Sequence, residues 1–180
     1  MARIILVDGP DNAGKTTMIK NICDIGDNYV ELKFPKRTVA GRFDIKSRNE
    51  VTCFETMLDY LSPKKVYVLD RGYISNWVYG HYRCEEQTST YKDDFVRLKN
   101  NHNVLPIILS RNEITEGFED DLISLSQSDF NLIIELFEQF AKEHNIKPVQ
   151  VLNHYGNNNI KSINAGEQEK LISDVIKWAK

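Results

Sequence analysis

The sequence predicts an α/β fold of three layers, in which helices cover both faces of a parallel sheet of five strands. Short apolar runs alternate along the chain with segments whose apolar residues recur at helical spacing. Most of the apolar runs end in a polar or charged residue, and no internal repeat interrupts the alternation. The length of 180 residues fits one domain with a substantial core. We therefore expect a single domain over residues 1–180, with a short lid at about residues 111–128.

Each expected element is placed by its apolar spacing and by the polar residues and glycines that flank it. Strands are expected at residues 4–8, 29–34, 66–70, 105–110 and 149–152. Helices are expected at residues 15–25, 49–61, 75–84, 93–99, 129–143 and 168–179. The polar segments 85–91 and 155–164 are expected to be surface loops. In open parallel sheets ligands bind beyond the carboxyl ends of the strands, so the residues at those ends are the first candidates for a site.

A phosphate-binding motif follows the first expected strand. Residues 9–17 read Gly-Pro-Asp-Asn-Ala-Gly-Lys-Thr-Thr, the spacing Gly-x4-Gly-Lys-Thr of a P-loop. Glycines allow the loop to turn tightly and to bring its N–H groups against phosphate oxygens, and the lysine supplies a mobile charge. Strand, loop and helix come in the order that a phosphate site at a helix N-terminus needs, which makes a chance glycine-rich turn the weaker interpretation. The fold is thus predicted to be of the P-loop NTPase type, binding ATP through Asp11, Asn12, Ala13, Gly14, Lys15, Thr16 and Thr17.

A second buried strand ends in a carboxylate followed by a guanidinium, Asp70 and Arg71. A carboxylate at this place can hold a water of a Mg²⁺ shell, while Thr16 offers the ion a hydroxyl. Arg71 can bind phosphoryl oxygens as charge develops on them. The alternative is a surface Asp–Arg pair that caps the strand. Because a P-loop lies in the same chain, the sequence favours the functional interpretation, with Mg²⁺ as the cofactor.

Three segments together resemble the thymidylate kinase group of P-loop nucleoside monophosphate kinases. They are residues 9–17, the Phe-Pro-Lys-Arg-Thr of residues 34–38, and Asp70-Arg71 followed by Ser75 and Tyr79. The resemblance implies that Lys15 binds the donor phosphates and that Asp70 helps to order Mg²⁺. It also implies an acceptor site in which Asp11 meets the sugar 3′-hydroxyl and Tyr79 lies under the deoxyribose. Arg37 and Arg71 would hold the acceptor phosphate, with Phe34, Phe54 and Ser75 as further substrate contacts.

The sequence departs from the family pattern where the base would bind. Members of the family carry an aromatic residue and, four residues later, an arginine that together grip thymine. Here Phe54 is followed at that spacing by Leu58, and the nearest arginine is Arg48. Arg48 is a candidate for a base or phosphate contact, and a solvated arginine at the start of a helix is the alternative. Thymine preference does not follow from these residues.

A second departure concerns the cations available for catalysis. The family places an additional cation in the P-loop or in the lid, but neither this P-loop nor residues 112–141 carry one beyond Lys15. The segment 112–141 instead holds eight acidic residues, and Arg111 is the cation at its edge. Phosphoryl transfer needs positive charge around the equatorial oxygens. We therefore expect Lys15, Mg²⁺, Arg71 and Arg111 to supply it, with Arg83 as a further candidate.

These observations predict a deoxynucleoside monophosphate kinase that transfers the γ-phosphoryl group of ATP to dTMP or a related deoxynucleotide. A deoxynucleoside kinase is the nearest alternative, but it commonly needs a carboxylate at the end of the second strand. Residues 33–37 are cationic there, Lys-Phe-Pro-Lys-Arg. A nucleotide-binding module without catalysis is the other alternative, and the lack of basic residues in the lid is its support.

Composition limits the partners and the compartment. The formal net charge of −3 argues against broad electrostatic binding to nucleic acid or to acidic membranes, and no leader or membrane span is evident. Cys23, Cys53 and Cys84 are odd in number and lack metal-ligand spacing, so we interpret them as reduced thiols of a cytoplasmic protein. The partners expected are small nucleotides, and the sequence leaves a homodimer open.

Overall fold

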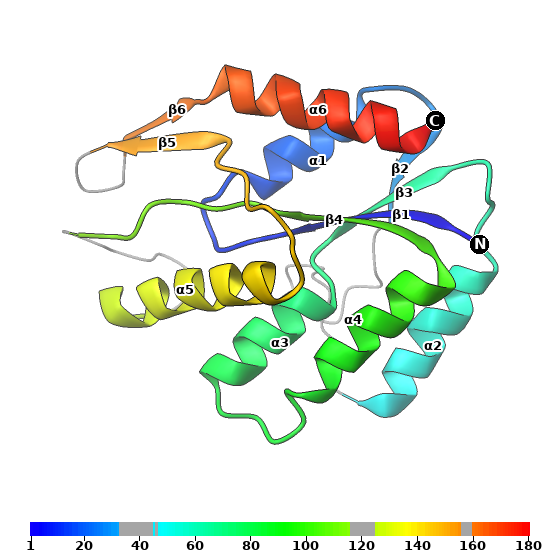
Figure 1. The fold of residues 1–180 in the computed structure, drawn as a ribbon, viewed down its shortest axis with the longest axis horizontal. Helices are drawn as coiled ribbons and strands as arrows, with labels where there is room; N and C mark the ends of the chain where they lie inside the picture. Colours follow the sequence, from blue (N-terminus) through cyan, green and yellow to red (C-terminus); the bar gives the residue numbers. More distant parts are fainter. Residues whose placement is uncertain (33–44, 46, 116–124, 156–159) are drawn as a thin grey trace.

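Four parallel strands form the central sheet of the computed structural model, which describes residues 1–32, 45, 47–115, 125–155 and 160–180. The strands are β1 (Arg3–Asp8), β2 (Tyr29–Glu31), β3 (Val66–Asp70) and β4 (Asn103–Ile108), in the order β2-β3-β1-β4. Figure 1 shows α1 (Lys15–Cys23) and α6 (Ala165–Ala179) on one face of this sheet. The other face carries α2 (Arg48–Asp59), α3 (Tyr73–Tyr82), α4 (Thr90–Asn101) and α5 (Gln127–Glu143). The predicted three-layer arrangement is confirmed.

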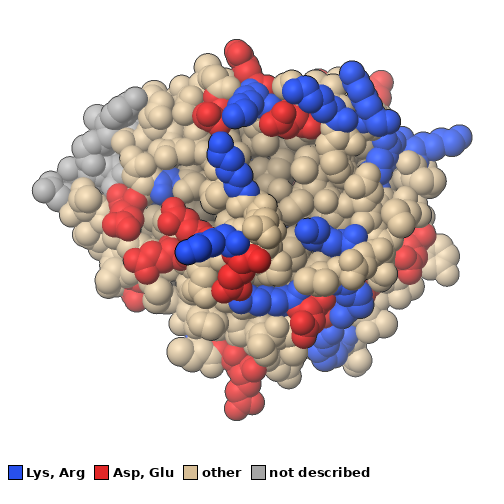
Figure 2. Space-filling model, in the orientation of Figure 1, with Lys and Arg blue, Asp and Glu red and all other residues tan. Residues whose placement is uncertain are grey.

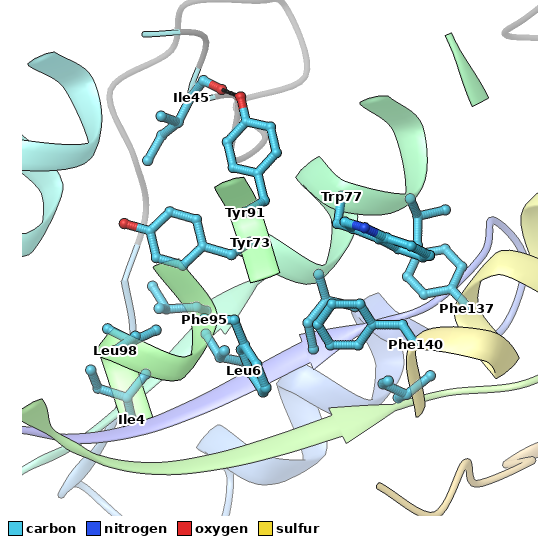
Figure 3. Close-up of a cluster of buried hydrophobic side chains, with 14 of the residues drawn as sticks. Ile4, Leu6, Ile45, Tyr73, Trp77, Tyr91, Phe95, Leu98, Phe137 and Phe140 are labelled. Carbon is cyan, nitrogen blue, oxygen red and sulfur yellow. Dashed lines mark hydrogen bonds between the residues drawn. The ribbon is translucent and has the colours of Figure 1, made fainter. Parts of the chain in front are cut away.

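The central strand β1 is buried on both faces, and its side chains alternate between two cores. Ile4 and Leu6 face the larger core, which Figure 3 shows with Tyr73, Trp77, Phe95 and Phe140 of the covering helices. Ile5 and Val7 face the second core, shared with α1 and α6. Burying a large apolar side chain contributes about 1.5–3 kcal/mol, so these contacts hold β1 firmly. The strand end that leads into the P-loop is therefore fixed by both cores.

The prediction of five strands is wrong for the described residues, because the segment 149–152 does not extend the sheet. Val149 makes one isolated parallel bridge with Leu109, beyond the end of β4. The next two carbonyl groups make hydrogen bonds with Asn164 instead of with a strand. The carbonyl of Gln150 accepts from the side chain of Asn164, and the carbonyl of Val151 accepts from the backbone N–H of Asn164. The start of α6 thus takes the carbonyls that a fifth strand would need.

The segment 155–164 is not simply a loop, which corrects a second prediction. Strands β5 (Leu152–Tyr155) and β6 (Ile160–Ile163) pair in antiparallel register beside the main sheet. Residues 85–91 are also only partly a loop, since α4 begins at Thr90. The other bounds differ by a few residues: α2 and α3 begin and end earlier than expected, and α6 begins earlier. The main-sheet strand β4 begins at Asn103 rather than at 105.

The lid expected at residues 111–128 lies partly outside the described residues, which leave out 116–124. Its last residues belong to α5, which begins at Gln127. That helix begins where it does because Ser126 and Asp129 form a reciprocal cap between side chains and backbone N–H groups. Residues 111–115 run from the end of β4 toward this helix. Asn131 and Gln127 of α5 both donate to the carbonyl of Ile114 and so anchor the segment.

The remaining composition-based expectations concern thiols, charge and membranes. All three cysteines are free, with Cys53 and Cys84 exposed and Cys23 partly buried. Acidic and basic side chains are interspersed on the face drawn in Figure 2. None of the described helices is long and apolar enough to cross a membrane.

Candidate active site

The P-loop between β1 and α1 has the backbone that a phosphate site needs. Gly9 has φ 146° and lies against β4, where an added Cβ would come within 2.4 Å of the carbonyl oxygen of Leu109. Gly14 has φ 92° and precedes α1 without a side-chain cap. The first turn of α1 also holds no acidic residue, so its N–H groups and positive dipole end are available to an anion. The loop geometry predicted from the spacing is thus present.

Lys15 is folded back onto the loop. Its Nζ donates to the carbonyl oxygens of Gly9 at 2.9 Å and Pro10 at 2.7 Å, and lies 3.7 Å from Oδ1 of Asp11. Only 9% of the residue is exposed. Burial, followed by the nearby charge of Arg71, lowers the pKa of Lys15 to about 8. The ammonium group is thus held in the loop by weak neutral acceptors, which phosphate oxygens can replace.

Arg71 lies close to Lys15, although Lys15 begins α1 and Arg71 directly follows the end of β3. Its Nη2 donates to Oδ1 of Asp11 at 2.7 Å, so one carboxylate contacts both cations. The guanidinium is 5.1 Å from the centre of the Tyr79 ring, and the residue is buried. Its backbone has φ 71°, a conformation that costs a non-glycine residue about 1–2 kcal/mol. Such strain often occurs at functional sites, because the surrounding structure must hold the residue there.

Arg111 brings a third cation to the loop from the end of β4. Its Nη1 donates to the backbone carbonyl of Asp11 at 3.3 Å, and its guanidinium is 5.0 Å from the centre of the Phe130 ring of α5. Burial lowers the pKa of Arg111 to about 10, which leaves it charged at neutral pH. The sequence predicted this cation but gave no sign of Phe130 beneath it.

The residues expected to hold Mg²⁺ fit that ion. Thr16 is exposed at the start of α1, where its hydroxyl can ligate a metal bound to phosphates. Asp70 ends β3, and its Oδ1 is buried without a partner among the described residues. A buried carboxylate oxygen of this kind is suited to accept a hydrogen bond from a metal-bound water. Within the described ranges, no group of three or more His, Cys, Asp or Glu side chains is placed to hold a metal ion.

A further carboxyl group, Asp8, was not among the predicted site residues. It ends β1, is fully buried, and accepts a hydrogen bond from the hydroxyl of Ser75. Burial raises the pKa of Asp8 to about 6, although the hydrogen bond from Ser75 and the charges of Arg71 and Lys15 act to lower it. The sequence feature that could have identified Asp8 as a site residue is its position directly before Gly9, the first residue of the P-loop.

Two residues predicted to contact the substrate base, Arg48 and Phe54, make contacts with other parts of the protein. Arg48 forms a bidentate pair with the buried Asp94 of α4, at 2.6 and 2.7 Å. Phe54 is buried in the larger core, with its ring edge-to-face with Tyr73. Phe34 and Arg37 lie outside the described residues, so their roles remain those that the resemblance implies.

The hairpin β5–β6 reaches the P-loop, a contact that sequence reasoning missed. The Nε2 of His154 lies 3.1 Å from the carbonyl oxygen of Asn12, whose φ is 60°. Val151 and Leu152 lie 3.1 and 3.2 Å from the position of a Cβ on Gly14, so a side chain there would be crowded. A scattered histidine gives no sequence signal for such a contact.

A parallel sheet that feeds a P-loop, with a strand-end Asp-Arg beside it, defines a P-loop nucleotide-binding fold. No protein-family model matches the sequence, and no curated protein matches it. Solved structures of P-loop kinases share this fold, and two thymidylate kinases among them align over nearly the whole chain. The chain therefore has a thymidylate kinase-like fold.

The structural matches cover nearly the whole of both chains but have low sequence identity. The thymidylate kinase from Ehrlichia chaffeensis has a TM-score of 0.56 at 18% identity, over 97% of this chain and 98% of that one. The thymidylate kinase from Candida albicans has a TM-score of 0.56 at 16% identity, over 99% and 94%. The deoxyadenosine kinase from M. mycoides, solved with dCMP and dCDP, has a TM-score of 0.54 at 16% identity, over 98% and 100%.

Proposed function

We infer that this protein is a deoxynucleoside monophosphate kinase, which transfers the γ-phosphoryl group of ATP to dTMP or a related deoxynucleotide. One observation carries this proposal. The carboxylate of Asp11 contacts Lys15 of the P-loop and Arg71 at the end of β3, so two buried cations lie side by side. A kinase that joins two phosphates needs one cation for each, held close together.

The donor phosphates are assigned to the P-loop. Phosphate oxygens would take the ammonium of Lys15 from the carbonyl groups of Gly9 and Pro10, which are neutral and weaker acceptors. The uncapped N–H groups of α1 would bind the same phosphates. Mg²⁺ bound through Thr16, with a water facing Asp70, would neutralise charge on the transferred group.

The acceptor phosphate is assigned to Arg71. This guanidinium is buried, lies over the ring of Tyr79 and is paired with a carboxylate that is 28% exposed. Binding of a phosphate there releases Asp11, which is then free to meet a sugar hydroxyl. Arg37 would add a second cation, as the resemblance implies. The tyrosine ring gives the deoxyribose a flat apolar surface.

Phosphoryl transfer to a nucleotide needs alignment and charge neutralisation rather than a base. The acceptor phosphate is already an anionic nucleophile, so the residues of this site only bind, orient and neutralise. Arg111 contributes a further positive charge to the P-loop, where it donates a hydrogen bond to the backbone carbonyl of Asp11. This arrangement supplies three protein cations, Lys15, Arg71 and Arg111, without a basic lid.

A deoxynucleoside kinase is the competing proposal, since one structural match is such an enzyme. Its chemistry needs a carboxylate to accept the proton of the 5′-hydroxyl. The described part of β2 offers Glu31, which is paired with Val68 and so projects on the same face as Val68. Val68 belongs to the core shared with α1, whereas Tyr79 packs against the opposite core. Glu31 therefore does not face the assigned acceptor site, and residues 33–37 carry no carboxylate in the sequence, which supports an acceptor that already carries phosphate.

The test is a panel of deoxynucleosides and deoxynucleoside monophosphates with ATP and Mg²⁺, in which ADP release is measured. Turnover with dTMP and none with thymidine would support the proposal. Turnover with thymidine alone would replace it by the nucleoside kinase, and no turnover with any acceptor would support a binding module. Arg71→Ala should raise the KM of dTMP about 10–100-fold, because a guanidinium–phosphate pair is worth about 1.5–3 kcal/mol, while the KM of ATP changes little.

A further inference from the structure

The buried carboxyl group of Asp8 has no role in the donor and acceptor sites assigned above. None of this residue is exposed, and its Oδ2 has no partner among the described residues. Burying a carboxyl group costs free energy unless hydrogen bonds or cations compensate. A neutral apolar residue would fill the end of β1 at lower cost. The group that Asp8 does contact, the hydroxyl of Ser75, indicates what it does.

Ser75 connects Asp8 to Arg71. A serine hydroxyl has one hydrogen and two lone pairs. The hydrogen is donated to Oδ1 of Asp8, so a lone pair accepts from Nη1 of Arg71, over a long hydrogen bond of 3.4 Å. The other terminal nitrogen of the guanidinium, Nη2, donates to Asp11. Arg71 thus contacts Ser75 of α3 at one terminal nitrogen and Asp11 of the P-loop at the other, and its charge also interacts with Tyr79.

The backbone of Arg71 is fixed by the same strand. Its N–H donates to the carbonyl of Val7 at 3.0 Å, which helps to keep the residue at its unfavourable φ of 71°. Strand β1 therefore fixes the backbone of Arg71 through Val7 and its side chain through Asp8 and Ser75. Alternation along β1 explains this, since Asp8 continues the series Ile4 and Leu6 on the face toward α3.

We propose that Asp8 and Ser75 are positioning residues, which hold the guanidinium of Arg71 where the acceptor phosphate binds. Phosphate must displace Asp11 from Nη2, but it leaves the contact from Ser75 to Nη1 in place. Ser75 is only 3% exposed and its one hydrogen is used, so it acts on the phosphate through Arg71. This inference rests on the proposed role of Arg71 at the acceptor phosphate.

The test is a double-mutant cycle on the affinity for dTMP, measured by calorimetry without ATP. With Arg71 present, Ser75→Ala should weaken dTMP binding about 3–10-fold, because the lost hydrogen bond is long and orients the guanidinium without contacting the phosphate. In the Arg71→Ala background, the same change should alter binding less than about 2-fold. Affinity for ATP should change little in both backgrounds, which a general loss of structure would not produce.

Asp8→Asn gives the second arm of the cycle. It should weaken dTMP binding when Arg71 is present, because the Ser75 hydroxyl is less firmly held. It should leave binding unchanged or tighten it in the Arg71→Ala background, because removal of a negative charge favours an anion. The control is Asp94→Asn, another fully buried aspartate that pairs with Arg48 and Arg97, whose effect should be the same in both backgrounds.

The outcomes separate this inference from the proposed function. Equal effects of Ser75→Ala in both backgrounds, or no effect where Arg71 is present, would overturn the positioning role while dTMP binding stands. Thermal unfolding of each variant checks that it is folded before its affinity is compared. Failure of the unaltered protein to bind dTMP would overturn the acceptor site, and this inference with it. A loss of dTMP affinity on Asp8→Asn that occurs only where Arg71 is present is the result that supports it most directly.

Discussion

Replacing Lys15 by methionine should raise stability while it removes function. Burial, followed by the charge of Arg71, lowers the pKa of Lys15 from 10.5 to about 8. At about 1.4 kcal/mol per unit, keeping the charged ammonium in the folded protein at neutral pH costs about 3 kcal/mol. Methionine removes this cost. The pKa shift compares the ammonium with the neutral amine, so methionine also removes the two hydrogen bonds of that amine to Gly9 and Pro10, each worth about 1 kcal/mol. The ligand-free Lys15→Met protein should be more stable by about 1 kcal/mol, or about 2–4 °C in Tm.

The pH dependence of this difference has a definite sign. Between the folded pKa of about 8 and the unfolded value of 10.5, the unfolded chain binds a proton that the folded protein has lost. The stability of the unaltered protein should therefore rise across this window relative to Lys15→Met. Thermal unfolding at pH 7 and pH 10 measures it. Lys20→Met, at an exposed position of the same helix, is the control and should be neutral.

Turnover by Lys15→Met should fall about 10²–10³-fold, because the lysine supplies charge where the transition state concentrates it. ADP release with ATP and the acceptor measures it. A variant that keeps half its activity would show that this is not a working P-loop. A Tm lowered by several degrees at pH 7 would show that the ammonium stabilises the fold, contrary to the expected cost of burying it.

Four further predictions follow from the site and its surroundings. Arg48→Ala should lower the free energy of unfolding by about 1–2 kcal/mol, because it leaves the buried Asp94 with one partner fewer. It should not change base preference, and a changed ratio of kcat/KM for dTMP and dGMP would contradict this. Phe130→Leu should lower kcat about 3–10-fold by removing the ring under Arg111, and unchanged kcat would show that the ring does not position it. Tyr79→Ala should let ribonucleotides approach deoxynucleotides in kcat/KM; equal use of UMP and dUMP by the unaltered protein would refute the sugar assignment. At least one nucleotide besides dTMP, such as dUMP or dGMP, should be used within about 100-fold of it, and strict dTMP specificity would mean that unidentified residues read the base.

Much of the donor side could be predicted because its residues are contiguous. The P-loop is a local pattern, and the strand and helix around it have strong periodicity. Asp70 and Arg71 were also accessible, since parallel strands bring their carboxyl ends to one edge of the sheet. These predictions depend on spacing within one segment or on a general property of sheets.

The features that the sequence did not predict depend on contacts between distant segments. Asp8 and Ser75 are 67 positions apart, and Arg48 and Asp94 are 46 apart, so no local pattern links either pair. The fifth strand failed for a related reason: Asn164 takes the carbonyls of residues 150 and 151, a competition that an apolar run cannot show. Strand β6 was missed because its four residues, Ile-Lys-Ser-Ile, do not alternate between apolar and polar, and the sequence before them is polar.

The central claim is tested by measuring the direct transfer of the γ-phosphoryl group from ATP to dTMP. ATP labelled at the γ-position is incubated with dTMP, Mg²⁺ and the protein, and the labelled product is identified by mass spectrometry, with thymidine in a parallel reaction. The account predicts labelled dTDP, no labelled product from thymidine, and loss of transfer in Lys15→Met. Label found only in thymidine monophosphate made from thymidine, or only in inorganic phosphate, would contradict it.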